Sequence, residues 1–300
     1  MRKATLMTIA MGFAAFVMVG GTCGTATMEM LKLNMPGLMP LENGFHYEGW
    51  AIIDGAAKTT GKFNIDTNGD IVDMAGAVIA NGEFDTGMDL TDATNIVISI
   101  EPDGDTDEIP SGTKFMAGEV SGHMADLDVS ATQALGNDFM GAMGKYILAT
   151  PTTTDTMDEL SGVWFLDLSG GSPAVGLTLP TLPSGWKYEG WAVIDGTPVT
   201  SGTFTMVDVA DDAAPYSGAG AGPPFPGEDF VMNAPTGMTF PTDLSGGTMV
   251  ISIEPDPDDG TGPFTLKPLV GMVPNPAMDH MTYDMDNKSA DFPMGSAEIK

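Results

Sequence analysis

The 300 residues carry a formal net charge of −30, and 42% of them are hydrophobic, which is enough for packed cores and excludes wholesale disorder. The single arginine is Arg2, so the clustered cations that phosphate-backbone recognition needs are missing, and nucleic acid is excluded as a partner. The acidity fits a solvated surface, solubility in a salty medium or attraction for divalent cations.

Residues 1–26 have the pattern of an export signal. A basic start at Arg2-Lys3 precedes a short apolar core over residues 6–19, and cleavage after Ala26 fits the small residues nearby. A lipid anchor at Cys23 and a retained anchor helix are the alternatives. We therefore expect an exported protein of the periplasm, cell surface or extracellular space, which is membrane-associated only if this segment is retained.

Two signatures occur twice in the same order along the chain. Residues 47–55 recur almost unchanged at 188–196, and residues 97–103 recur without change at 250–256. Such self-similarity indicates a duplicated domain. The offset between copies grows from 141 to 153, which predicts an insertion of 12 residues in the second copy, placed at 217–227.

This register divides the chain into a first repeat at 27–150, a connector at 151–159 and a second repeat at 160–300. Frequent Gly and Pro exclude long helices, while Val-, Ile- and Thr-rich runs favour strands. The strands predicted in the first repeat are 47–53, 61–66, 95–101, 114–120 and 145–150.

Asn68-Gly69 is a strong hairpin signal between two of these strands. Residues 126–143 could form a short helix. Six or seven short strands per repeat predict an all-β protein built as two tandem antiparallel β-sandwiches of the immunoglobulin-like (Ig-like) kind.

The repeated residues resemble the extracytoplasmic C-terminal domain of anti-sigma-K-factor-type proteins over about 70 residues per copy. That domain has a Tyr-x-x-Trp strand, a Gly-x-Phe strand and a strand ending in Glu-Pro. The matching residues here are Tyr47, Trp50, Gly61, Phe63, Glu101 and Pro102, then Tyr188, Trp191, Gly202, Phe204, Glu254 and Pro255.

The resemblance implies a sensory role outside the cytoplasm. The transcription regulators of that family join this outer domain, through a membrane helix, to a cytoplasmic sigma-binding domain. We find no counterpart of that domain and no zinc-type His/Cys cluster in this sequence. The resemblance therefore implies a doubled outer module that cannot itself bind a sigma factor.

Candidate catalytic chemistry is sparse. Glu101 and Glu254 could suggest the paired carboxylates of glycoside hydrolysis, but they lie in different repeats. We expect each to accept backbone N–H groups at the turn before its proline. Neither a nucleophile elbow nor a phosphate-binding glycine motif is present. These features predict that the protein is not an enzyme.

Acidic loops follow both Glu-Pro pairs. Asp103, Asp105 and Asp107 alternate like the start of a calcium loop, and the second copy offers Asp256 and Asp258. The glycine and glutamate that complete an EF-hand are missing, so plain solvated loops are the alternative. The 24 methionines and the His-Met pairs suggest copper binding, but these residues are not closely clustered.

We expect an exported, non-enzymatic binding or sensory module whose partner is an envelope or extracellular protein or glycan. A calcium-stabilised structural or adhesive surface protein is the alternative, and a carbohydrate-active enzyme is a weaker third. Because the shared signatures set strands and turns, we expect function where the copies differ. These places are the acidic loops and the insertion around residues 218–227.

Overall fold

The structure, a computed structural model, describes residues 29–300 and is all-β, with 40% strand and 2% helix. The predicted all-β antiparallel class is confirmed, while the export signal at 1–26 lies outside the described residues. The helical segments in residues 29–300 are two short 3₁₀ turns, η1 (Ala80–Gly82) and η2 (Ser289–Asp291). This part of the chain therefore holds no helix with the length and apolar character that crossing a bilayer requires.

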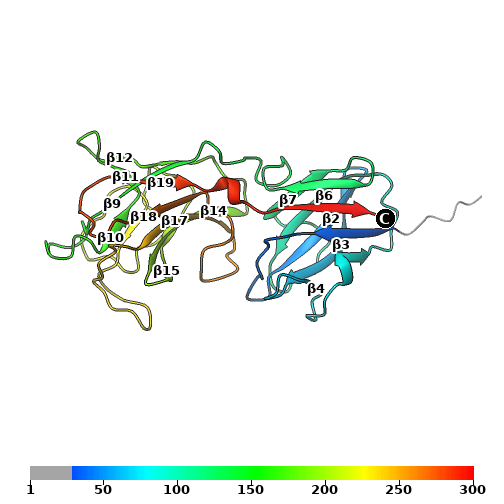
Figure 1. The fold of residues 1–300 in the computed structure, drawn as a ribbon, viewed down its shortest axis with the longest axis horizontal. Coiled ribbons are helices and arrows are strands. Elements are labelled where there is room, and N and C mark those ends of the chain that lie inside the picture. The colour runs from blue at the N-terminus through cyan, green and yellow to red at the C-terminus, as the bar shows by residue number, and fades with distance from the viewer. Residues whose placement is uncertain (1–28) are drawn as a thin grey trace, which may run out of the picture.

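The strands form two lobes that lie end to end (Figure 1). The first lobe follows the order β4-β3-β2-β6-β7-β8-β20-β1-β5. Its strands are β1 (Met30–Asn34), β2 (His46–Ile53), β3 (Ala56–Ile65), β4 (Ile71–Val72), β5 (Glu83–Asp85), β6 (Ala93–Glu101), β7 (Lys114–Glu119), β8 (Met124–Asp128) and β20 (Met294–Ile299).

The second lobe follows the order β15-β14-β17-β18-β19-β9-β10-β16, with β13 also paired to β9 and a separate β11-β12 pair. Its strands are β9 (Met143–Leu148), β10 (Gly162–Trp164), β11 (Leu166–Asp167), β12 (Ala174–Val175), β13 (Leu177–Thr178), β14 (Trp186–Ile194), β15 (Thr197–Phe204), β16 (Gly227–Asp229), β17 (Thr248–Pro255), β18 (Leu269–Met272) and β19 (Tyr283–Asn287).

Each lobe is built around one large antiparallel sheet that curves round on itself. The two sheets form a half-barrel and a nearly closed barrel. In the first lobe, β5 returns to β3, where the Phe63 and Phe84 rings lie 5.6 Å apart. We predicted two packed sheets per repeat, as in an Ig-like sandwich, whereas hydrogen bonding follows a single path of strands through each lobe.

The last strand of each repeat lies in the lobe of the other repeat. β20, from the end of the chain, pairs with β8 and β1 in the first lobe, where it appears as the red strand (Figure 1). β9, from the end of the first repeat, pairs with β19 and β10 in the second lobe. The lobes therefore differ from the contiguous repeats predicted at 27–150 and 160–300.

The registers show that β9 and β20 occupy equivalent places. Both strands begin Met-Gly, at Met143 and at Met294. In the first lobe Leu31 faces Ile299 and Leu127 faces Gly295. In the second lobe Val163 faces Leu148 and Met285 faces Gly144, which is the same arrangement. The two repeats have thus exchanged their closing strands reciprocally.

The repeated signature builds a hairpin in each lobe. Asp54 and Gly55 both have positive φ (52° and 76°) and join β2 to β3, as do Asp195 and Gly196 in the second lobe. Positive φ at both central residues is the geometry of a tight type I′ hairpin turn, which Asp-Gly favours. The hairpin predicted at Asn68-Gly69 is also present, between β3 and β4.

The aromatic residues of the repeated signature are buried, but they lie on two faces of the sheet. Tyr47 stacks on Phe63 at 5.4 Å in the main core, and Tyr188 stacks on Phe204 at 5.6 Å. Trp50 instead lies in a small separate cluster with Ala117 and Ala134. Successive side chains of a strand alternate between faces, so Tyr47 and Trp50 point in opposite directions.

The lobes are joined by more than the exchanged strands. The Phe115 ring lies 5.5 Å from Phe264 and 6.4 Å from Trp186. Thr113 Oγ1 donates to the carbonyl of Gly185 at 3.0 Å. The main hydrophobic core therefore continues from one lobe into the other.

Two sequence-based expectations are wrong. Residues 126–143 form no helix: they hold the end of β8, turns and the start of β9. The insertion does not lie mainly at 217–227, because β16 takes the place of β5. Most of the extra length follows β16, where residues 230–247 correspond to the shorter connection 86–92.

Candidate functional site

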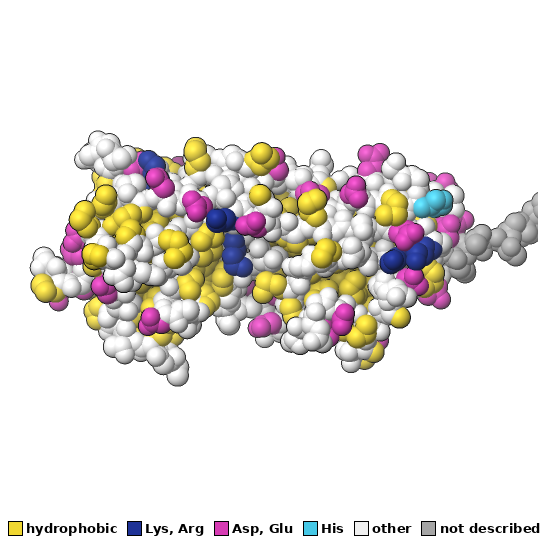
Figure 2. Space-filling view, viewed as in Figure 1, with side chains coloured by type: hydrophobic (Ala, Val, Ile, Leu, Met, Phe, Trp, Pro, Cys, Tyr) yellow, Lys and Arg dark blue, Asp and Glu magenta, His cyan; other side chains and the backbone are white. Residues whose placement is uncertain are grey.

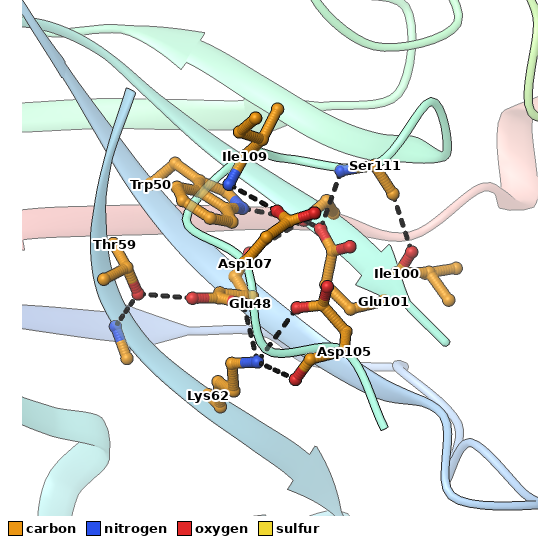
Figure 3. Close-up of polar contacts among 12 residues, drawn as sticks. Glu48, Trp50, Thr59, Lys62, Ile100, Glu101, Asp105, Asp107, Ile109 and Ser111 are labelled. Atoms are coloured by element: carbon orange, nitrogen blue, oxygen red, sulfur yellow. Dashed lines mark hydrogen bonds and ion pairs between the residues drawn. The ribbon is translucent and has the colours of Figure 1, made fainter. Parts of the chain in front are cut away.

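A series of buried hydrogen bonds connects the repeated tryptophan to the Glu-Pro signature of the first lobe (Figure 3). Trp50 Nε1 donates to Ser99 Oγ at 2.7 Å, and Ser99 Oγ in turn donates to Glu101. Glu101 also accepts the backbone N–H of Ser111 at 2.9 Å. Glu101 therefore closes the loop after Pro102, as the sequence predicted, and also orients the tryptophan through the serine.

The second lobe repeats this series residue for residue. Trp191 Nε1 donates to Ser252 Oγ at 2.7 Å, and the backbone N–H of Phe264 donates to Glu254 at 2.9 Å. Burial raises the pKa of Glu254 to about 8, against its hydrogen bonds from Ser252 and Phe264. This carboxyl therefore holds its proton to much higher pH than a solvated glutamate.

Replacing the serine of this series is expected to destabilise the protein. Ser252→Ala leaves the buried Trp191 N–H without an acceptor, and an unpaired buried polar group costs about 1–3 kcal/mol in the free energy of unfolding. Ser201 is equally buried but has no hydrogen-bond partner in the described part of the chain, so Ser201→Ala is expected to be neutral or stabilising. Urea denaturation of both variants measures the difference, and equal losses would contradict the assigned role.

Each lobe also holds a second buried glutamate, which sequence reasoning missed. Glu48 accepts from Thr59 Oγ1 at 2.5 Å, and Glu189 accepts from Thr200 in the same way. Burial raises the pKa of Glu48 above its ordinary value, against the hydrogen bond from Thr59 and the charge of Lys62. Burial raises the pKa of Glu189 to about 7. The signal was visible, because this glutamate lies inside the repeated Tyr-Glu-Gly-Trp strand.

In the first lobe, three more polar side chains lie close to Glu48. His46 lies two residues before Glu48 on β2, and Asp105 and Lys62 come from the acidic loop and β3. Lys62 Nζ lies 3.0 Å from Asp105 Oδ2 and 3.5 Å from Glu48 Oε2. One ligand atom from each of His46, Glu48 and Asp105 lies within 4.8 Å of the others. We call these three residues the His46 cluster; among the described residues no other such group of three metal-binding side chains occurs.

The five aspartates predicted as calcium ligands do not come together in one place. Asp103 lies against Gly44, Asp105 joins the His46 cluster, and Asp107 accepts the backbone N–H of Ile109 at 2.8 Å. In the second lobe, Asp256 lies 3.9 Å from Lys187 in an ion pair. Asp258 accepts the backbone N–H of Gly260 at 3.0 Å. A calcium role for these loops stays a prediction.

A further group of buried acids is specific to the second lobe. Asp229 accepts from Trp164 Nε1 at 2.7 Å and from the backbone N–H of Thr152 at 2.8 Å. Its neighbour Glu228 accepts from Ser217, and burial raises the Glu228 pKa to about 7. These contacts tie the predicted connector 151–159 to the segment around residue 217, so they hold the lobe together.

An open groove lies between the lobes. Its volume is about 320 Å³, and its walls are Met39, Pro40 and Glu42 of the first lobe with Asp259–Phe264 of the second. Asn43 Nδ2 donates to the carbonyl of Asp259 at 2.9 Å beside it. The second lobe's wall belongs to the loop after Glu254-Pro255, where the two copies differ in sequence. We call this feature the interlobe groove.

The charged surface is dominated by scattered carboxylates. In the face shown in Figure 2, the few cations lie beside acidic side chains and form no basic patch. No family model, curated protein or solved structure significantly matches this chain. The resemblance to the anti-sigma-K-type outer domain therefore stays a prediction.

Proposed function

We propose that this protein is an exported, non-enzymatic binding or sensory module, and that it takes its partner in the interlobe groove. The observation that carries the proposal is the composition of that groove, to which both lobes contribute. Its volume of about 320 Å³ is at the lower end of ligand pockets, so it suits one side chain or one sugar residue of a larger partner.

The resemblance to the outer domain of anti-sigma-K-type proteins supports a sensory role outside the cytoplasm. The partner is then an envelope or extracellular protein or glycan. Glu42 and Asp259 give the groove an acidic wall, while Met39 and Phe264 supply apolar contact. These residues favour a partner that presents an apolar group next to a positive charge or a hydrogen-bond donor.

The arrangement of carboxylates supports binding over glycoside hydrolysis. Glu48 and Asp105 bring two carboxylates close together, but the Glu48 side chain is only 2% exposed. A glycosidase needs both carboxylates to flank the same bond of a bound sugar. A buried Glu48 does not offer that access.

The test is capture from envelope extracts with two matched glycine variants. Gly262→Trp places an indole in the interlobe groove, whereas Gly170→Trp places one in an exposed loop of the second lobe. Neither position has positive φ, so both accept a side chain without backbone strain. We expect Gly262→Trp to reduce capture of a specific partner at least about tenfold and Gly170→Trp to leave it unchanged. Equal capture by the two variants would remove the groove from the proposal.

A further inference from the structure

The His46 cluster has the geometry of an incomplete metal site. His46 and Glu48 are two residues apart on β2, so their side chains point to the same face of the sheet. Asp105 reaches that face from the loop after Pro102. One imidazole nitrogen and two carboxylate oxygens thus lie within 4.8 Å of one another. In a tetrahedral site with bonds of about 2.0–2.1 Å, ligand atoms are about 3.4 Å apart, so small side-chain shifts close the site.

Within the described residues, the imidazole of this cluster is buried without a partner, while its two carboxylates pair only with Lys62 and with a threonine. His46 is 3% exposed, yet neither of its ring nitrogens has a hydrogen-bond partner among residues 29–300. In the same range, Glu48 Oε2 has only the ion pair with Lys62 Nζ at 3.5 Å, and the other oxygen of that carboxylate accepts from Thr59. Leaving a buried polar atom unpaired costs about 1–3 kcal/mol, so an unpaired buried imidazole beside two carboxylates points to a ligand.

We propose that His46, Glu48 and Asp105 bind a divalent transition-metal ion of the zinc type. A ligand set of one imidazole and two carboxylates is suited to Zn²⁺ or Co²⁺ and leaves a fourth position open. Calcium is disfavoured, since it takes six to eight oxygen ligands. Asp105 is partly exposed, with 12% of its side chain accessible, and provides the route for the ion. The site shares no residue with the interlobe groove and does not depend on a partner there.

Lys62 competes with the ion for this site. Its ammonium group pairs with both carboxylates of the cluster, at 3.0 Å from Asp105 and 3.5 Å from Glu48. Metal binding therefore has to move this ammonium aside. Lys62→Met removes the competing charge and is expected to tighten metal binding about tenfold or more.

The second lobe supplies an internal comparison. Glu189 and Asp258 occupy the places of Glu48 and Asp105, but Lys187 stands where the first lobe has His46. Thr203 replaces Lys62 opposite the glutamate, so no lysine competes on that strand. Lys187→His is therefore expected to add a second metal site.

The experiment is a Co²⁺ and Zn²⁺ titration of the full chain, followed by visible absorption and calorimetry. We expect one ion per chain, a rise in melting temperature, and no competition from Ca²⁺. His46→Gln and Asp105→Asn are expected to weaken binding at least about tenfold. The other two histidines, His123 and His280, are exposed, and His123→Gln and His280→Gln serve as matched controls that keep full affinity.

Two results would overturn the site. One is the absence of Co²⁺ or Zn²⁺ binding at millimolar metal in both the wild type and Lys62→Met. The other is binding that survives Asp105→Asn but disappears in His280→Gln or Cys23→Ser. If His46→Gln does not fold, Asp105→Asn and Lys62→Met carry the test, because both positions are partly exposed. Two ions bound by Lys187→His support the ligand assignment, and one ion would contradict it.

Discussion

Deletion of residues 294–300 is expected to unfold the first lobe although these residues end the second repeat. Without β20, both β8 and β1 lose a hydrogen-bonded neighbour. Ala297 and Ile299 are also buried on this strand, at 2% and 6% exposure. Lost apolar burial and lost ladder bonds together amount to about 4–6 kcal/mol, a large share of the stability of an ordinary domain.

Hydrogen exchange measured by mass spectrometry reads this result strand by strand. We expect amides of β1 and β8 to lose protection, while those of β17 and β18 keep it. Met294→Ser, at a side chain that is 62% exposed on the same strand, is the control and is expected to change little. A synthetic peptide of residues 288–300 is expected to restore protection by adding the missing strand.

Unchanged protection in β1 and β8 after the deletion would contradict this role of β20. Loss of protection in β10 and β19 instead would mean that β9 had moved into the first lobe. That outcome is physically open because β9 fits the same register. Both outcomes differ from the expected one at identifiable amides.

The stability of the second lobe is expected to fall as pH rises from 5 to 8.5. The pKa of Glu254 is raised from 4.5 to about 8, mainly by burial and in smaller part by the charges of Glu189 and Asp258. The folded state therefore binds this proton more tightly than the unfolded state. The stabilisation is complete below about pH 4.5 and is lost as pH rises through about 8.

Glu254→Gln separates this effect from the general charge of the chain. One pKa unit corresponds to 1.36 kcal/mol. Allowing for relaxation around the ionised group, we expect the wild type to lose about 2–4 kcal/mol in the free energy of unfolding over this pH range. The amide keeps an acceptor for the Phe264 N–H and cannot ionise. The variant is therefore expected to be the more stable protein at pH 8.5 and to show a flatter profile.

Urea denaturation at several pH values measures both profiles. Glu108→Gln removes one negative charge from an exposed loop and controls for the change in net charge. It is expected to keep the slope of the wild type. Parallel slopes for Glu254→Gln and the wild type would show that Glu254 is not the group responsible.

Local features of the fold were predictable from the sequence. Asp54-Gly55 and Asn68-Gly69 encode their turns locally, because Asp54, Gly55 and Gly69 adopt the positive φ that these turns require. The burial of Trp50 and Phe63 agrees with their place in the predicted strands. These signals depend only on neighbours in the chain.

The strand exchange could not be predicted in the same way. β9 and β20 share the same beginning and the same register, although β9 carries the buried Tyr146 where β20 carries the buried Ala297. The choice depends on contacts between residues more than 100 positions apart, such as Leu31 with Ile299. A local pattern indicates the strands but does not say which lobe each one joins.

The candidate site was predictable only in part. We predicted that Glu101 accepts a backbone N–H group at the turn before Pro102. The hydrogen bond from the Ser111 N–H group agrees with this prediction. Glu48 was overlooked, although a glutamate inside an otherwise apolar repeated strand is a signal of a buried polar role. The approach of His46 and Asp105 depends on strand register and on loop geometry, which one sequence does not specify.

The pairing of β1 with β20 has a mechanical consequence. The backbone of Met30 bonds to that of Lys300 in both directions, at 3.0 and 2.9 Å, so the two described ends meet at one point. A stretching force applied between residues 29 and 300 therefore opens this ladder from its end, one pair of bonds at a time. Such unzipping needs less force than shearing a ladder whose bonds share the load. Under tension the first lobe opens at this seam, while the second lobe initially bears no load.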